Sequence, residues 1–243
     1  MFLFLFGSIV AGVITRSFQD PVERKPTHTS DHEWAQRSYG YAPHPSDHED
    51  AIIQVYAART WGGKKAFAVH TWIATKRKGA NQYVISEIFA WRLSRRGTAL
   101  HQRPGVPDRS WARNAPTLLL DVRGKEAEAL MDKVDSAITS YPWKSEYTAW
   151  PGPNSNTFMA WIGLQVPEMK LDLPSTAIGK DWRPILDTFG TSTSGTGVQA
   201  SLYGLLGVTV GLEEGLEVNI LGLSTELDVF DLGVELPGIG RVW

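Results

Sequence analysis

The sequence predicts an α+β fold in which an antiparallel sheet packs with two main helices, behind an N-terminal apolar helix. Three observations carry this prediction: β-rich stretches at residues 51–91 and beyond Lys180, and an amphipathic helical pattern over residues 124–140. We divide the chain into an apolar anchor, a polar linker and a single globular α+β domain. These parts cover residues 1–18, 19–50 and 51–243.

The amino-acid composition indicates a globular protein and argues against nucleic-acid binding and cysteine chemistry. The chain has 243 residues, of which 42% are hydrophobic, and this is enough for a substantial core. Its 24 basic and 26 acidic residues give a formal net charge of -2, so nothing points to a nucleic-acid partner. There are no cysteines, which excludes disulfides, thiolate metal sites and cysteine nucleophiles. We expect no cofactor.

The first fifteen residues form an uncharged apolar run, M-F-L-F-L-F-G-S-I-V-A-G-V-I-T, which ends at Arg16. A helix needs about 20 residues to cross a bilayer, and continuing through Phe18 with Arg16 reaching the interface narrows the gap. A secretory signal carries basic residues before its apolar run, and none stand here. We therefore expect an uncleaved anchor, with membrane lipid and membrane-protein complexes as partners. Arg24 and Lys25 favour a cytoplasmic body but leave the side of the membrane open.

The linker contains two similar segments, H-T-S-D-H-E at 28–33 and H-P-S-D-H-E at 44–49. Imidazole and carboxylate groups at this spacing are ordinary ligands of zinc and other divalent ions. The alternative is a solvated linker with a chance repeat, since ordering a mobile segment costs entropy and no closed ligand set is forced. We assign no metal site.

Strands are expected where β-branched and aromatic residues concentrate, at residues 51–57, 66–74 and 82–91. A turn, K-R-K-G-A-N, separates the last two. If Lys78 and Gly79 are its central residues, His70 stands opposite Glu87 on the neighbouring strand. A different loop length would shift this register.

Two helices and a second group of strands follow. The first helix covers residues 124–140, where one apolar stripe consists of Ala127, Leu130, Val134 and Ile138. The second runs from Ser155 to about Gln165 and ends near Pro167. The later strands are L-G-V-T-V-G-L, L-E-V-N-I-L-G-L and T-E-L-D-V-F, with a hairpin turn at Glu213–Gly215.

The stretch W-P-G-P-N-S-N-T-F at residues 150–158 places Ser155 at a helix start, near unpaired N–H groups and the positive end of the helix dipole. There a serine serves as a cap or as a nucleophile. In the catalytic interpretation His70 is the general base, Glu87 orients it, and Asn154 or Asn156 stabilises an oxyanion. The plainer interpretation is a capping serine and a satisfied core histidine.

Several segments resemble a bacterial family, the domain of unknown function 3750, over about residues 52–243. They are V-Y-A-A-R-T-W-G, F-A-V-H-T-W-I, P-G-P-N-S-N-T-F, L-P-S-T-A-I-G-K-D, S-G-T-G-V-Q and E-G-L-E-V-N-I-L-G-L. That family carries no established activity. Since it is bacterial, we expect the anchor to lie in the inner membrane.

More distantly, a histidine strand followed by N-S-N-T-F on a helix is similar to circularly permuted papain-like proteins of the NlpC/P60 and lecithin-retinol-acyltransferase type. Those proteins have a cysteine at the helix start. The resemblance implies a permuted papain-like core, with Ser155 as nucleophile, His70 as base and Glu87 as orienting residue. It leaves two functions open: a serine-variant amide or ester hydrolase or acyltransferase, and a non-catalytic subunit of a cell-envelope or membrane complex.

Overall fold

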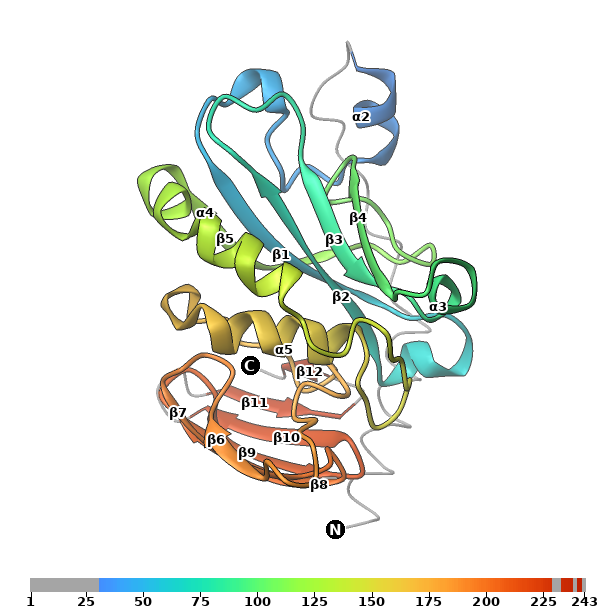
Figure 1. Cartoon of the computed structure of the whole chain (residues 1–243), viewed down its shortest axis with the longest axis vertical. Coiled ribbons are helices and arrows are strands. Elements are labelled where there is room, and N and C mark those ends of the chain that lie inside the picture. The colour runs from blue at the N-terminus through green and yellow to red at the C-terminus, as the bar shows by residue number, and fades with distance from the viewer. Residues whose placement is uncertain (1–30, 229–232, 238–239, 242–243) are drawn as a thin grey trace.

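Two antiparallel sheets, with two long helices between them, dominate the computed structural model, which describes residues 31–228, 233–237 and 240–241 (Figure 1). The predicted α+β class with antiparallel sheets is confirmed. In the parts of the chain that are described, no helix is both long and apolar enough to span a membrane. The expected apolar helix at residues 1–18 lies outside them.

The first sheet has five antiparallel strands in the order β4-β3-β2-β1-β5. Their bounds are β1 Ile52–Arg59, β2 Val69–Lys76, β3 Val84–Ile88, β4 Leu100–Pro104 and β5 Thr117–Arg123. The two central strands, β1 and β2, are buried along almost their whole length, because both faces of the sheet are covered. Three of the five strands were predicted; β4 and β5 are short or only partly buried, so their sequences lack a clear alternation.

Two helices cover one face of this sheet. Helix α4, Gly124–Thr139, contacts β1 and β5, and all four residues of its predicted stripe are buried. Helix α5, Ser155–Gln165, packs against β2, β3 and α4. Both helices were predicted with nearly these bounds.

The second sheet is a meander of seven strands in sequence order. Its strands are β6 Phe189–Thr191, β7 Gly197–Leu202, β8 Leu206–Gly211, β9 Gly215–Ile220, β10 Leu223–Asp228, β11 Gly233–Leu236 and β12 Gly240–Arg241. A close contact joins this part to α5: a side chain at Gly163 would lie 2.7 Å from the carbonyl oxygen of Thr193. The helix is thus buried from both sides, which explains why it is apolar nearly all round.

The described part of the expected linker has regular structure. It contains helix α2, His32–Arg37, and the short 3-10 helix η1, Pro45–Asp47. Helix α2 lies against the face of the first sheet that α4 and α5 leave free. Trp34 is buried in that face. The carboxylate of Asp108 accepts hydrogen bonds from the Ser38 hydroxyl and from the N–H groups of Tyr39, Tyr41 and Ala42. Residues 31–48 therefore belong to the folded body.

Two local expectations were wrong. Lys78 and Gly79 are the central residues of a turn, as expected, and the Ala80 N–H donates to the Arg77 carbonyl at 3.0 Å. The ladder of β2 and β3, however, has Thr75 with Val84 as its last pair, so the register deduced from this turn does not continue into the strands. Continuing this register places His70 opposite Phe89 rather than Glu87, a shift of two residues. The third strand also stops at Ile88, because Ala90–Arg96 form helix α3, which Gly97 ends in a left-handed conformation.

Candidate functional site

Strand β2 distributes the candidate residues over two faces, since successive side chains of a strand point in opposite directions. Val69 and Ile73 contribute to the core shared with α4 and α5. Trp72 and Ala74 belong to the second core, under the N-terminal segment. His70 has the parity of Trp72, and its ring stacks on Trp72 at 6.0 Å. It therefore points away from α5.

His70 and Glu87 do share one face, as predicted, because a register shift of two residues preserves the facing. The His70 Nε2 atom lies 3.3 Å from Glu87 Oε2. The same carboxylate accepts two hydrogen bonds from Arg109 Nη2, at 2.8 and 2.9 Å. The imidazole also stacks on Trp111, with ring centroids 4.1 Å apart. Glu87 thus joins the histidine to a buried arginine that the sequence did not single out.

Burial, the hydrogen bond between His70 and Glu87, and the charge of Arg109 together determine the charges in this cluster. Burial alone would raise the pKa of Glu87, but the hydrogen bond with His70 and the charge of Arg109 outweigh it and lower the pKa to about 2. Burial lowers the pKa of His70, and the neighbouring Glu87 offsets this only in part. Near neutral pH the histidine is therefore neutral and the carboxylate is paired with the guanidinium.

Ser155 is the first residue of α5 and lies on the opposite face of the first sheet. Its carbonyl oxygen accepts a hydrogen bond of 3.1 Å from the Thr71 hydroxyl, and Thr71 is the β2 residue that faces α5. The predicted orientation of the Ser155 hydroxyl toward the His70 imidazole is therefore wrong. Ser155 is not the cap either, since Asn154 holds that position. The Ser155 side chain has no hydrogen-bond partner among the described residues, and Ser155 is only 4% exposed.

Asn154 and Asn156 are occupied by structural hydrogen bonds. The Asn154 Oδ1 atom accepts from the N–H groups of Asn156 and Thr157, and its Nδ2 donates to the carbonyls of Ala149 and Ile178. Asn156 Nδ2 donates to the carbonyls of Val69 and Ile178, at 3.2 and 2.8 Å. A side-chain amide has two N–H donors, so neither residue has one left for an oxyanion. The predicted oxyanion role does not fit this geometry.

We call Asn154, Asn156 and Thr157 the asparagine clamp, because their side chains bind α5 to β2 and to the segment around Ile178 and Gly179. The Thr157 hydroxyl completes the set by donating to the Gly179 carbonyl at 2.8 Å. Gly179 has φ +94, and a Cβ there would overlap the Asn154 amide. Two of the segments singled out in the sequence are therefore in direct contact: N-S-N-T-F at residues 154–158 and A-I-G-K-D at residues 177–181.

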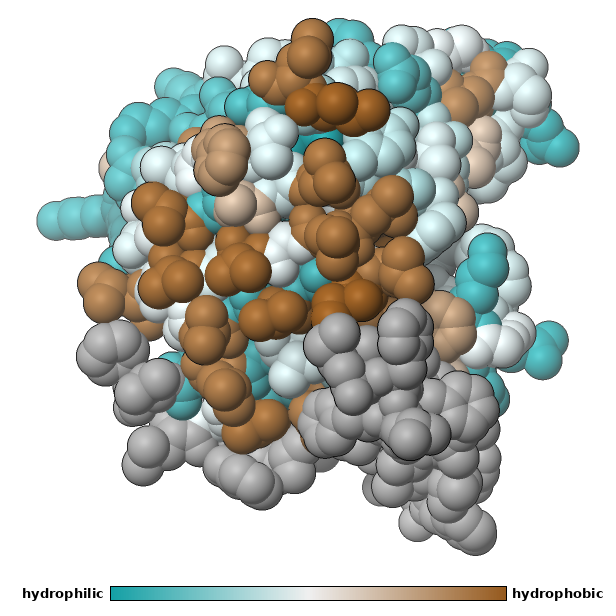
Figure 2. All heavy atoms as spheres, turned by 90° about the horizontal axis from the view of Figure 1, so that it is seen from below, coloured by the Kyte–Doolittle hydropathy of each residue, from teal (hydrophilic) through white to brown (hydrophobic). Residues whose placement is uncertain are grey.

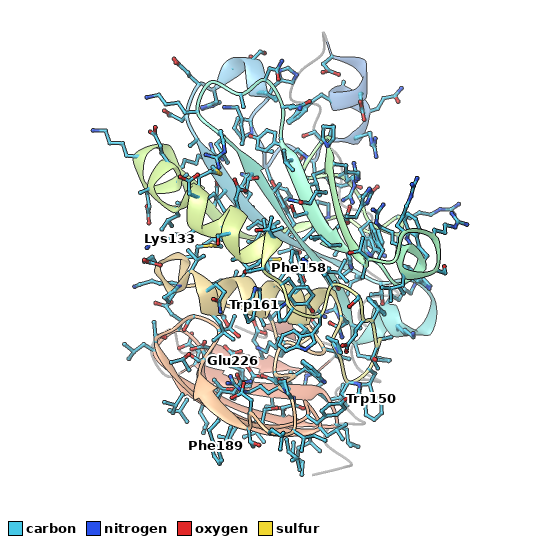
Figure 3. All side chains as sticks on the ribbon, viewed as in Figure 1. Lys133, Trp150, Phe158, Trp161, Phe189 and Glu226 are labelled. Carbon is cyan, nitrogen blue, oxygen red and sulfur yellow. The ribbon has the colours of Figure 1, made fainter. Side chains whose placement is uncertain are left out.

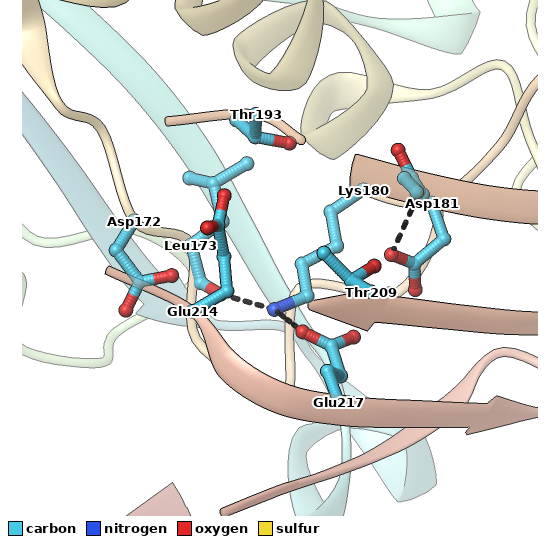
Figure 4. A pocket seen from close by; sticks show the side chains of 9 residues that line it. Asp172, Leu173, Lys180, Asp181, Thr193, Thr209, Glu214 and Glu217 are labelled. Carbon is cyan, nitrogen blue, oxygen red and sulfur yellow. Dashed lines mark hydrogen bonds and ion pairs between the residues drawn. The ribbon is translucent and has the colours of Figure 1, made fainter. Parts of the chain in front are cut away.

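A second polar cluster lies between α5 and the second sheet, around Lys180 (Figure 4). Its ammonium group lies 2.6 Å from Glu217 Oε2 and 3.9 Å from Glu226 Oε2, and it donates to the Leu173 carbonyl. Burial and the negative charge of Asp181 raise the pKa of Glu217 to about 8, although Lys180 lowers it. Burial raises the pKa of Glu226 to about 9.

This cluster encloses too little space for a substrate. The cavity between Lys180, Glu217 and the neighbouring side chains holds about 10 Å³, the lower limit for one water molecule. The sequence analysis did not identify these residues. In an alternating strand such as L-E-V-N-I the apolar positions are normally buried, so the polar positions that form this cluster were expected to face solvent. No group of three or more His, Asp or Glu residues in the described chain is arranged to hold a metal ion.

Comparison with protein families matches residues 50–182 to the family described as Protein of unknown function (DUF3750). The match ends before the second sheet, whereas the sequence resemblance was expected to continue to residue 243. No curated protein and no solved structure matches the chain.

Gly179→Ala is expected to lower the free energy of unfolding by roughly 2–5 kcal/mol, because it adds a left-handed penalty to an overlap with Asn154. Gly97→Ala is the matched control: its φ is +69, but nothing lies within 4 Å of the new methyl group. It should cost only about 1–2 kcal/mol. Urea unfolding measures both, and equal losses would show that the close approach of Asn154 is not a constraint.

Raising the pH is expected to lower the free energy of unfolding of the wild type through Glu217, and Glu217→Gln should remove this part of the pH dependence. The folded-state pKa of Glu217, about 8, lies above its unfolded value, so the folded protein retains a proton that the unfolded chain releases above about pH 4.3. This stabilisation is full below that pH and is lost as the pH rises through about 8. The free energy of unfolding of the variant, measured relative to that of the wild type, should therefore rise by roughly 2–4 kcal/mol between about pH 5 and pH 8.5.

Urea unfolding at a series of pH values tests this expectation. Glu128→Gln, at an exposed position of α4, is the control and should run parallel to the wild type. A parallel curve for Glu217→Gln would contradict the raised pKa.

Proposed function

The chain belongs to the DUF3750 family, and we propose that it is a non-catalytic, membrane-associated binding protein, a subunit of a cell-envelope or membrane complex. The observation that carries this proposal is the position of Ser155 and His70 on opposite faces of the first sheet. A serine hydroxyl needs a base within hydrogen-bond reach, since it is almost never ionised alone. The neutral imidazole and the ion-paired Glu87 serve the packing of β2, β3 and Arg109 instead.

The asparagine clamp supports the same proposal. In an enzyme of the expected kind, the helix start would offer free donors to an oxyanion. Here the amides of Asn154 and Asn156 hold β2 and the backbone around Ile178 in place. Their arrangement suits a rigid scaffold that presents a surface.

Association with a membrane is supported by the sequence of residues 1–15, which contains no charged residue. Such a run partitions into a bilayer, and the bacterial inner membrane is the proposed location. Membrane lipid and membrane-protein partners follow from this placement.

The second candidate function is a serine-variant amide or ester hydrolase or acyltransferase with a permuted papain-like, NlpC/P60-like core. One observation favours it: the Ser155 hydroxyl stands at a helix start without a partner among the described residues. The burial of Ser155 and the direction of His70 weigh against it.

The full chain is expected to give no covalent adduct with a fluorophosphonate, because Ser155 has no base and little access. Intact-mass spectrometry of the wild type and of Ser155→Ala should show the same unmodified protein, under conditions that fully label a known serine hydrolase. A stoichiometric adduct that Ser155→Ala abolishes would support the hydrolase, and its loss in folded His70→Gln would identify the base.

Charges placed in the apolar run should release the protein from the membrane fraction. Leu5→Arg combined with Val10→Arg disfavours insertion by about 2.5–3.5 kcal/mol per arginine, so the double variant is expected in the supernatant after cell fractionation. The control, Glu126→Arg with Ala129→Arg, changes two exposed positions of α4 and should remain in the pellet. Substitution is preferable to truncation at Asp50, which would remove the buried Trp34. Equal distribution of both double variants would contradict the proposed anchor.

A further inference from the structure

The second sheet has its apolar side chains on the outside. Along β7 to β10, polar and charged residues such as Gln199, Glu217 and Glu226 are buried on the side of α5, while the alternate positions are exposed and apolar. We call this exposed surface the outer face. It consists of Phe189, Val198, Leu202, Leu206, Val208, Val210, Leu212, Leu216, Val218, Leu221 and Leu227, each at least 39% exposed. Figure 2 shows apolar side chains gathered across this side of the molecule.

We infer that the outer face docks on a lipid bilayer and enters the boundary between the headgroups and the acyl chains. This inference rests on the proposed membrane association and names the surface and the ligand that serve it. A soluble monomer rarely exposes a contiguous apolar patch of more than about a few hundred Å². A half-buried antiparallel sheet normally places its apolar positions inside, and here the inside holds the Lys180 cluster.

The chemistry of the outer face fits hydrocarbon better than a protein partner. The outward positions of β7 to β10 carry no charged side chain, and Thr225 is the polar residue among them. A protein interface of standard size needs about one hydrogen bond per 100–200 Å². The centre of this face offers almost no donors or acceptors for them, whereas acyl chains need none.

An open hollow lies in this face where a small side chain stands among large ones. Ala200 is paired with Phe189 on one side and with Val208 on the other. The hollow has a volume of about 400 Å³, and Leu202, Leu206 and Ile220 contribute to its lining. Its open shape and largely apolar lining suit contact with hydrocarbon.

The loop before β6, the edge strand of this sheet, also exposes apolar side chains. Leu186 is 99% exposed and Ile185 is 63% exposed, and both precede Phe189, which points away from α5 in Figure 3. The charges of this loop are paired, because Arg183 Nη2 lies 3.0 Å from Asp187 Oδ2. The loop can therefore insert two large apolar side chains without an uncompensated charge.

The length of the chain before the described body brings this face near a membrane. The uncharged run ends at Thr15 and the described structure begins at Asp31. The fifteen residues between them span at most about 50–55 Å when fully extended. A body tethered at this distance meets the bilayer at a high effective concentration, so even a modest apolar surface docks on it.

The rim of the face predicts the lipid preference. At one edge Lys170 pairs with Glu213, with 3.4 Å between Nζ and Oε1, and at another Arg183 pairs with Asp187. Paired charges give no attraction to anionic headgroups. Docking should therefore occur on zwitterionic phosphatidylcholine and should change little with added anionic lipid or salt.

The absence of native cysteines permits a direct test in the full chain. Single-cysteine versions Val208→Cys, Leu186→Cys and Val84→Cys are labelled with an environment-sensitive fluorophore and mixed with phosphatidylcholine vesicles that carry acyl-chain nitroxides. Val84 is the matched control, a strand valine that is 37% exposed outside the outer face. Labels at 208 and 186 should shift to shorter wavelength and be quenched at a depth of about 5–10 Å. The label at 84 should stay accessible to aqueous iodide.

A second variant separates the face from the anchor. Val208→Lys with Val218→Lys should abolish nitroxide quenching of the label at 186, while the chain still sediments with the vesicles. Persistence of the quenching would overturn the inference. Iodide access at 208 without nitroxide quenching would overturn it and leave the proposed membrane association standing, and protection from both quenchers would assign the face to a second copy or another protein. Failure of the wild type to sediment with vesicles would overturn the docking and the membrane association together.

Discussion

One carbonyl group links the two halves of the structure. The oxygen of Ile178 accepts a hydrogen bond from Asn154 and another from Asn156, so both of its lone pairs are used. Through these bonds the start of α5, the strand β2 and the segment leading to the second sheet meet at a single buried point. Two residues later, Lys180 enters the interior of the second sheet. The position of that lysine therefore depends on the asparagine clamp, and the inner face of the second sheet depends on the lysine.

The sequence predicted the features that depend on neighbouring residues alone, such as the bounds of the helices and the side of a strand on which a side chain lies. The bounds of α5 were predicted correctly from the helix start at Ser155 and the proline that follows Gln165, although the cap is Asn154 and not Ser155. The buried stripe of α4 follows from helical spacing. His70 and Glu87 share a face because facing depends only on whether a register shift is even or odd. The face occupied by α5 could not be predicted this way, because it depends on the sheet as a whole. An offset of β2 by one residue would place His70 on the face of α5.

The second sheet shows where a sequence pattern is ambiguous. Alternation in L-E-V-N-I predicts a strand with one apolar face, but it does not say which face is covered. The decision lies in residues far away: Lys180 supplies the cation for Glu217, and Asp181 accepts hydrogen bonds from Gln199 and Asn219. Burying these polar groups together satisfies most of them, and the apolar positions are left outside. A buried charge cluster thus determines the character of an exposed surface.

The first strand of this sheet carries a further consequence at its edge. Arg183 donates through Nη2 to the carbonyl of Phe189, and its guanidinium occupies the space beside Gly190. An open sheet ordinarily offers a row of unpaired backbone groups on which another strand can grow. Here a bulky cation covers a strand of only three residues. The carbonyl of Phe189 is therefore not available to a neighbouring strand, and the β6 edge of this sheet is a poor template for pairing with another chain.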